Sequence, residues 1–598
     1  MNTCQQVTSH ALGVSFGYFA QEIGLISKLQ QVSIPMKTVY HSPQEKLIEF
    51  FVSITLGMVH LKDISHSGYP LVRDPELARA WCQDHFADYT GVSRVLSRIG
   101  ATEYAHIKQV LGEVSTPFFE EERTVFDRSS KPMIWDCDLT GVEVSEYSHT
   151  YPHSRFGHMN HDTLGQGYQL PYVVLTGLDS KLVLASELLA GNRNSVSCLK
   201  DSLHVGEQYV GIPRRRPELL TATIHNVKEQ THNLTSLLTK AQTKLHNDAV
   251  SHQGCLEKIA RWKRELTERP CSHKPFSTYQ KLKRQIASKE QMVIRIQQRR
   301  PRLEHLVTRY QERIQEVSTT LLSWQAYQAR LERDNTTEQR FNTVIVRHDG
   351  GFASQENLIW EAASGYYFIS KGYNSLSTTA FVNRKTGEGV ALNAVSTGWL
   401  FPNETLPGLP MPVDVLLIEQ TATPTPKSSV ILAYLPFHLA AQALFTFYNA
   451  RNTVEASIKE GKAVFSLRPF KVRSEYGIKL QQLFTQFAQN FIRWFHRWAF
   501  QKTNAEFFHH IGVKESVKTA ANTMAHIRYE QHDITLTFHE FSCYAGKQLI
   551  FENVPQTPQN TVSETHQTAG NTSKRWQYPY IWICQKIHAL RNIPFRRT

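Results

Sequence analysis

The segment Thr343-Val344-Ile345-Val346-Arg347-His348-Asp349-Gly350-Gly351-Phe352 indicates the fold class of this chain. Its run of β-branched residues predicts a strand, and the run stops at the carboxylate of Asp349. The two glycines that follow permit a sharp turn. Open α/β sheets present ligand-binding groups where their strands end, so Asp349 is a candidate site residue.

A second segment, Met133-Ile134-Trp135-Asp136-Cys137-Asp138-Leu139-Thr140, repeats this pattern of an apolar run that reaches a carboxylate. Side chains alternate along a strand, so Asp136 and Asp138 share one face. Either of them is a candidate partner for Asp349. Two such segments predict an α/β protein with acidic groups at one edge of its sheet.

The third segment is Tyr448-Asn449-Ala450-Arg451-Asn452-Thr453-Val454-Glu455, followed by Lys462. On a helix, positions 448, 451, 455 and 462 advance by three, four and seven, so the four side chains share one face. The tyrosine and the two cations suit a phosphate, and the carboxylate suits a divalent cation. A solvated charged face is the ordinary alternative for such spacing.

Together, the three segments supply the oxygen-donor side chains that metal-assisted phosphoryl transfer needs. We expect Asp138, Asp349 and Glu455 to bind two Mg²⁺ ions, for which Mn²⁺ could substitute. Tyr448, Arg451 and Lys462 are the predicted phosphate-binding residues. The combination, rather than any one member, carries the prediction.

These motifs resemble those of the DDE transposases of bacterial insertion sequences, in the insertion-sequence-four group with its Y-2-R-3-E-6-K signature. The spacing of Tyr448, Arg451, Glu455 and Lys462 matches that signature at every position. Asp138-Leu139-Thr140 resembles the D-x-T motif of the family, and Asp349 to Phe352 resembles its D-x-G-F motif. The threonine favours Asp138 over Asp136. The resemblance covers roughly residues 40 to 500.

The resemblance implies a ribonuclease H-like α/β catalytic domain with a β-rich insertion. It implies an enzyme that binds the inverted repeats of its element as double-stranded DNA, cleaves the ends through a hairpin intermediate and joins them to target DNA. A homodimer in the DNA complex is expected. Two alternatives stay open, namely a transposase-derived DNA-binding protein whose chemistry has lapsed and a scaffold whose coiled coil recruits proteins.

The expected domain order is as follows. It comprises an N-terminal helical DNA-binding domain (1–125), a ribonuclease H-like core in three parts (126–215, 339–372 and 431–505), a coiled-coil hairpin insertion (216–338), a β-rich insertion (373–430) and a C-terminal extension (506–598). Strands are expected at 366–369, 378–382, 390–392 and 413–418.

In the N-terminal domain, residues 74–99 can form two helices around a turn near residues 87–90. This resembles a helix-turn-helix and places Arg94 and Arg98 where they could contact DNA. A plain packing unit is the alternative.

The predicted hairpin follows from apolar residues that recur at alternating steps of four and three. One seam runs from Leu220 to Leu266 and a second from Leu303 to Leu331, with a kink expected at Pro301. Such a pair forms an antiparallel coiled coil, which could serve dimerisation or contact DNA.

Composition agrees with a nucleic-acid partner. The chain has 598 residues, with 66 Lys and Arg against 53 Asp and Glu, a formal charge of +13. Its eight cysteines include no C-x-x-C pair, which argues against a zinc knuckle. No signal peptide or membrane span is expected, so we predict a cytoplasmic, nucleoid-associated protein. Residues 554–573 read as a linker, and residues 574–598 as a basic aromatic tail.

Overall fold

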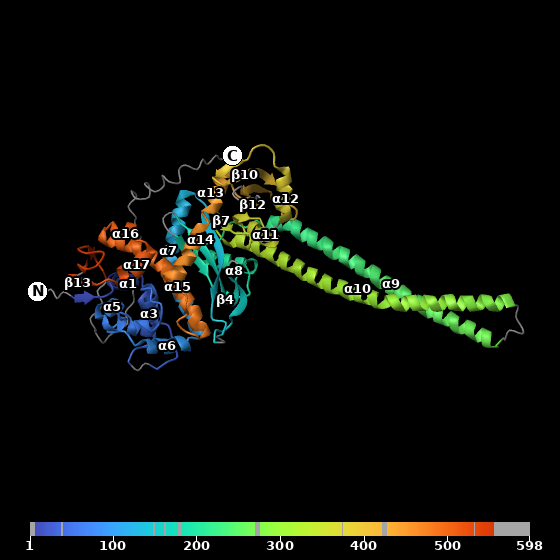
Figure 1. The fold of residues 1–598 in the computed structure, drawn as a ribbon, viewed down its shortest axis with the longest axis horizontal. Helices are drawn as coiled ribbons and strands as arrows, with labels where there is room; N and C mark the ends of the chain where they lie inside the picture. Colours follow the sequence, from blue (N-terminus) through green and yellow to red (C-terminus); the bar gives the residue numbers. More distant parts are fainter. Residues whose placement is uncertain are drawn as a thin grey trace. The chain divides into compact units, whose positions relative to one another are not determined.

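The computed structural model describes residues 6–37, 40–147, 150–160, 163–177, 181–268, 276–372, 375–420, 427–530 and 533–554 (Figure 1). The chain divides into two compact units. The core unit comprises residues 1–214 and 340–598, and the hairpin unit comprises residues 215–339. The predicted basic aromatic tail and nearly all of the predicted linker lie outside the described residues.

The main sheet of the core unit has strand order β3-β4-β2-β7-β8-β12-β11-β10-β9, with β5 and β6 paired to β4. The pairs β2–β7 and β7–β8 are parallel, whereas β2–β4 and β8–β12 are antiparallel. The sheet is therefore mixed, with parallel strands at its centre. Its strands are β2 (Met133–Glu143), β3 (Arg155–Asn160), β4 (Thr163–Thr176), β5 (Lys181–Ser186), β6 (Leu189–Ala190), β7 (Val344–His348), β8 (Tyr367–Lys371), β9 (Val390–Asn393), β10 (Ser396–Glu404), β11 (Val413–Gln420) and β12 (Lys427–Tyr434).

The structure of residues 373–430, the predicted β-rich insertion, adds to the sequence prediction in one respect and corrects it in another. Its strands continue the main sheet, because β12 pairs with β8 and β11 pairs with β12. The strand expected at 378–382 is wrong, since these residues lie in helix α12 (Ser375–Arg384). The ring of Phe381 is buried and lies 5.0 Å from that of Phe401, so packing of an aromatic side chain outweighs local strand propensity.

The N-terminal region is not wholly helical. Strand β1 (Gln6–Thr8) pairs with β13 (Ala525–Glu530), which continues into β14 (Asp533–Phe538) and β15 (Gln548–Phe551) as a second sheet. The expected helical character of residues 1–125 holds from α1 onward, whereas the short strand β1 departs from it because this strand completes a sheet formed by C-terminal residues. The helices of this region are α1 (Ala11–Glu22), α2 (Leu25–Gln30), α3 (Pro43–Thr55), α4 (Asp63–His66), α5 (Pro75–Ala80), α6 (Tyr89–Arg98) and α7 (Ala101–Ser129).

Helix α15 (Glu475–Thr503) joins these N-terminal helices to the sheet. Its Phe491 ring lies 5.0 Å from Phe19 of α1, and its Trp494 stacks on Phe118 of α7 at 4.4 Å. On the sheet side, the amide of Asn490 accepts from the backbone N–H of Val183 and donates to its carbonyl. A single helix rich in aromatic residues thus packs against both regions.

The remaining helices of the core unit complete its layers. They are α8 (Ser195–Val210), α11 (Gln355–Ala363), α13 (Ala441–Asn449), α14 (Asn452–Ala463), α16 (Phe507–His510) and α17 (Val513–Lys518). None of the helices in the described ranges has both the length and the apolar character needed to cross a bilayer.

The hairpin unit consists of α9 (Leu220–Glu268) and α10 (Phe276–Thr337), preceded by a short 3-10 turn and packed side by side (Figure 1). Cys255 and Ile259 of α9 form an apolar cluster with Ile286 and Val293 of α10. The second seam therefore begins well before Leu303, where the sequence pattern placed its start. Helix α10 continues through Pro301 without a break.

Candidate active site

The three predicted carboxylates come from three different elements of the core unit. Asp138 lies on β2, Asp349 directly follows β7 and Glu455 lies on α14. Strands β2 and β7 are parallel, with Asp136 opposite Arg347. Asp138 and Asp349 each lie two residues beyond that pair, so the two carboxylates lie past the same end of the parallel β2–β7 pairing. The backbone N–H of Gly351 donates to Asp349 Oδ1 at 2.9 Å and so fixes that carboxylate in the turn.

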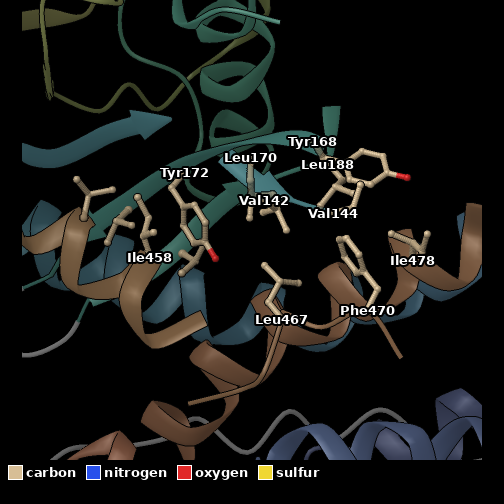
Figure 2. Close-up of a cluster of buried hydrophobic side chains, with 13 residues drawn as sticks. Val142, Val144, Tyr168, Leu170, Tyr172, Leu188, Ile458, Leu467, Phe470 and Ile478 are labelled. Carbon is tan, nitrogen blue, oxygen red and sulfur yellow. The ribbon is translucent and has the colours of Figure 1, made fainter. Parts of the chain in front are cut away.

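Helix α14 is held against the sheet by its apolar face. Val454 and Ile458 belong to a buried cluster with Val142 of β2 and Tyr172 of β4, and Figure 2 shows Ile458 beside Tyr172. Such burial contributes roughly 1.5–3 kcal/mol for each large apolar side chain. It leaves Glu455, next to Val454, with 45% of its side chain exposed.

Arg451 connects the carboxylates. Its Nη1 lies 3.4 Å from Asp138 Oδ2, and its Nη2 lies 3.8 Å from Glu455 Oε1. Although burial lowers the pKa of the Arg451 guanidinium, Asp138, Tyr448, Asp349 and Glu455 together raise it above its ordinary value. These four predicted site residues therefore all act electrostatically on one cation. Arg451 Nη1 is buried without a hydrogen-bond partner, which is unusual for so strong a donor.

The pKa values of the neighbouring groups show the same coupling. Burial raises the pKa of the Asp138 carboxyl, Arg451 and the N–H of Leu139 lower it, and the charges of Asp349 and Glu455 raise it further. Burial likewise raises the pKa of the Tyr448 hydroxyl. Three acidic groups that are distant in sequence thus influence one another electrostatically. Such coupling is common among the ionisable groups of active sites.

Asp136 is in a different environment from Asp138, although the two share a strand face. The side chain of Asp136 is 0% exposed, and Arg347 is 2% exposed. Arg347 Nε donates to Asp136 Oδ1 at 2.6 Å and Arg347 Nη2 donates to Oδ2 at 2.8 Å. The hydroxyls of Thr176 and Thr453 also donate to Oδ2, at 2.9 and 2.5 Å. These bonds satisfy Asp136 as a structural group, so Asp138 is the better placed ligand.

Arg347 also explains a departure from the predicted helix. Tyr448 lies on α13, and Arg451 lies at the start of a second helix, α14, so residues 448–462 do not form one continuous helix. Arg347 Nη1 donates to the carbonyl of Phe447 at 2.7 Å, and Nη2 reaches that of Ala450 at 3.4 Å. These bonds satisfy carbonyls at the end of α13, which helix termini leave free.

Lys462 does not point freely into the site. Its Nζ donates to Thr140 Oγ1 at 2.7 Å and to the carbonyl of Gly141 at 2.8 Å. Burial lowers the pKa of this lysine, as does Arg468, while Asp138 raises it. Lys462 therefore ties α14 to β2 next to Asp138. Thr140, the threonine of the D-x-T motif, is its partner.

A buried pair that the sequence pattern did not reveal supports Asp349. His348 Nε2 lies 3.1 Å from Glu361 Oε2, and both side chains are fully buried. His348 Nδ1 lies 3.0 Å from the backbone carbonyl of Asp349. The pair fixes the turn at the end of β7. The only sign of the His348–Glu361 pair in the sequence is a histidine at the end of an apolar strand. This pattern is too common to identify a functional residue.

Arg94 and Arg98 are separate from these groups. Both are exposed on α6, which packs on α3 and α15 through residues such as Val92 and Leu96. The helix before it, α5, ends at Ala80, so the connecting segment is longer than the predicted turn. The pair can contact an external partner but does not belong to the acidic site.

The donor set fits a divalent cation such as Mg²⁺ in its chemistry. Three carboxylates supply hard oxygen ligands, and the unsatisfied Arg451 Nη1 can bind a phosphate oxygen. Among the described residues, no three His, Cys, Asp or Glu side chains are grouped closely enough to hold a metal ion in the present arrangement. Arg451 lies between Asp138 and Glu455, so metal binding requires the guanidinium to shift toward the phosphate.

Comparisons of the chain with protein-family models and with curated proteins found no match.

Proposed function

We propose that this protein is a DDE-type transposase, a DNA nuclease and strand transferase whose core is a ribonuclease H-like domain. The observation that supports this most directly is the approach of Asp138, Asp349 and Glu455 to one another around Arg451. More than two hundred residues separate Asp138 from Asp349, and more than one hundred separate Asp349 from Glu455. No local sequence pattern requires these residues to lie close together.

In this proposal, the side chains have different roles in phosphoryl transfer. Asp138, Asp349 and Glu455 would hold the divalent cations. When bound, such cations stabilise the charge of the transition state and lower the pKa of a bound water. Once it has shifted from Asp138, Arg451 would hold a non-bridging oxygen of the scissile phosphate through Nη1, which has no hydrogen-bond partner here, and Tyr448 would assist from beside Arg451. Fixed donors of this kind act by preorganisation, because they need not reorient as charge develops.

The reaction consists of two chemically equivalent substitutions at phosphorus. In the first, a water oxygen loses a proton and bonds to the phosphorus, the P–O3′ bond breaks, and the departing 3′-oxygen takes up a proton to become a hydroxyl. In the second, that hydroxyl loses its proton, and its oxygen bonds to a phosphorus of the opposite strand, which gives a hairpinned end, or of target DNA. The P–O3′ bond of the attacked strand breaks, and its 3′-oxygen takes up a proton. One set of residues serves both steps, since in each of them an oxygen nucleophile displaces an oxygen leaving group.

The test is a cleavage assay on duplexes that carry the inverted repeats flanking the gene, with Mg²⁺, with Mn²⁺ and with chelator. We expect nicked and hairpinned ends from the wild type with either metal, and none from D138N, D349N or E455Q. The control is E356Q, which removes a carboxylate exposed on α11. Binding without cleavage under every metal condition would instead support a lapsed DNA-binding protein.

A further inference from the structure

The net charge of the chain is concentrated in part of the hairpin unit. Residues 215–339 contain 23 Lys or Arg and 13 Asp or Glu, which is +10 of the +13 of the whole chain. Within them, residues 258–309 contain 15 Lys or Arg and four Asp or Glu, a net +11. The rest of the hairpin unit contains eight and nine, a net −1. A coiled-coil surface adapted only to water mixes both signs.

Five of these cations form a line along α10, which we call the basic stripe: Lys281, Arg284, Arg295, Arg302 and Arg309. Lys281, Arg295, Arg302 and Arg309 are separated by multiples of seven residues, and Arg284 lies one turn from Lys281. The buried residues Ile296, Val317, Trp324 and Leu331 also differ by multiples of seven. The stripe therefore keeps a constant position relative to the seam, on the outer side of the helix.

The cations of the basic stripe are available to an external partner. All five are exposed. Within the described part of the hairpin, none of them forms an ion pair, whereas the nearby Arg299 is bound by Asp248 and Arg300 lies 2.8 Å from Glu304. Like charges held in a row repel one another, which costs stability unless an anionic partner offsets the repulsion.

The dimensions of the basic stripe suit a duplex. From Lys281 to Arg309 there are 28 residues, or roughly 42 Å at about 1.5 Å per residue. One turn of B-DNA is about 34–36 Å, so cations spaced every seven residues can reach phosphates along about one turn. Two copies of the stripe cannot pack on each other without bringing like charges together.

We propose that the basic stripe is a DNA-binding surface that holds the phosphate backbone of duplex DNA independently of its sequence. The choice of DNA as the polyanion rests on the function proposed above. The stripe supplies affinity through release of counterions, and it contributes no chemistry to cleavage.

The experiment measures binding by the full-length protein of a labelled random-sequence duplex of about 40 base pairs, which at about 3.4 Å per pair is longer than the stripe. Chelator prevents cleavage, and the salt concentration is varied. The variant is K281Q/R284Q/R295Q/R302Q/R309Q. The matched control is K228Q/K240Q/K244Q/R330Q/R333Q, which removes five exposed cations from the part of the hairpin with balanced charge. Helical circular dichroism verifies that both variants fold.

We expect the stripe variant to bind at least about tenfold more weakly at about 0.1 M salt, with a flatter dependence on salt, and the control to match the wild type. Equal effects of the two variants, or no effect of either, would overturn the inference. Stripe-dependent binding to vesicles rich in phosphatidylserine, without binding to the duplex, would also overturn it. Stripe-dependent duplex binding by a protein that never cleaves the inverted repeats rejects the proposed nuclease but retains this surface.

Discussion

Near the carboxyl end of the β2–β7 strand pair, two Asp–Arg pairs hold the same kinds of side chain in opposite states, with Asp136 and Arg347 at the inner end and Asp138 and Arg451 at the outer end. At the inner end, Asp136 and Arg347 are fully buried, and each carboxylate oxygen is bonded to the protein. At the outer end, Asp138 and Arg451 lie 3.4 Å apart without a hydrogen bond, and Asp138 is 18% exposed. Complete satisfaction is typical of a structural pair. Acidic groups in excess and a donor without a hydrogen bond are typical of a site that binds a ligand.

The largest expected effect concerns the outer carboxylates. Substitution D138N should lower the cleavage rate by about 10³-fold or more, because it removes a charged ligand of the reacting centre (about 4 kcal/mol). Cleavage of an inverted-repeat duplex under single-turnover conditions measures this. An activity of D138N within tenfold of the wild type would remove Asp138 from the mechanism.

The same variant should not lose stability. Because the folded protein raises the pKa of Asp138, ionisation of this carboxyl opposes folding. The unfavourable contribution is absent below the ordinary pKa of an aspartate and is fully present above the raised pKa. Urea unfolding should therefore show D138N to be equally stable or more stable at neutral pH, with the difference vanishing in acid.

Substitution in the inner pair, Asp136 and Arg347, should instead lower stability. Substitution D136A leaves Arg347 buried without a countercharge and should destabilise the protein by about 3–5 kcal/mol. The midpoint of urea unfolding measures this. The double variant D136L/R347L removes both charges and should recover much of the loss. A loss below about 1 kcal/mol for D136A would mean that the inner end is solvated and that the contrast between the two ends is false.

Arg451 should affect catalysis at an intermediate level. Substitution R451Q retains hydrogen-bond donors but removes the charge that binds the phosphate in the proposed mechanism. It should lower cleavage by about 10²-fold with little change in stability. R451K restores the charge without the planar fork, so it should recover only part of the rate. If R451Q instead unfolds the protein, the guanidinium is a structural partner of Asp138, as Arg347 is of Asp136.

Lys471 supplies a last test, because its Nζ is buried without the carboxylate partner that Arg347 has. Its Nζ lacks a hydrogen-bond partner, and burial, together with the charge of Lys518, lowers its pKa to about 7. The folded protein therefore binds fewer protons than the unfolded chain between about pH 7 and the ordinary lysine pKa. Over this range, the stability of the wild type relative to K471M should rise by about 1.4 kcal/mol per pH unit. Urea unfolding at several pH values measures this, and a constant difference would contradict it.

The sequence was informative where a local pattern has a direct physical meaning. The strand that ends before Asp349 and the heptads of the hairpin follow from residue patterns alone. Spacing also identified the carboxylates and Arg451 as a candidate set. The structure adds that Asp138, rather than Asp136, has the exposure and the neighbours of a ligand.

Other features depend on contacts that no single segment encodes. The break between Tyr448 and Arg451 follows from hydrogen bonds with Arg347, which is about one hundred residues away in the chain. The pairing of β1 with β13 joins the two ends of the core unit, so a helical pattern near the N-terminus could not reveal it. Residues 378–382 form a helix because Phe381 packs on a neighbouring strand. Long-range packing, rather than propensity, decided each case.

The most direct test of the contrast between the Asp136–Arg347 pair and the Asp138–Arg451 pair is to locate Mn²⁺ by anomalous scattering. The crystals contain the protein bound to an inverted-repeat duplex. We predict metal peaks in contact with the carboxylates of Asp138, Asp349 and Glu455, with Arg451 moved onto a phosphate oxygen and the Asp136–Arg347 pair unchanged. Crystals that contain the duplex and Mn²⁺ but show no peak at these three carboxylates, with Arg451 still between Asp138 and Glu455, would contradict the proposed active site.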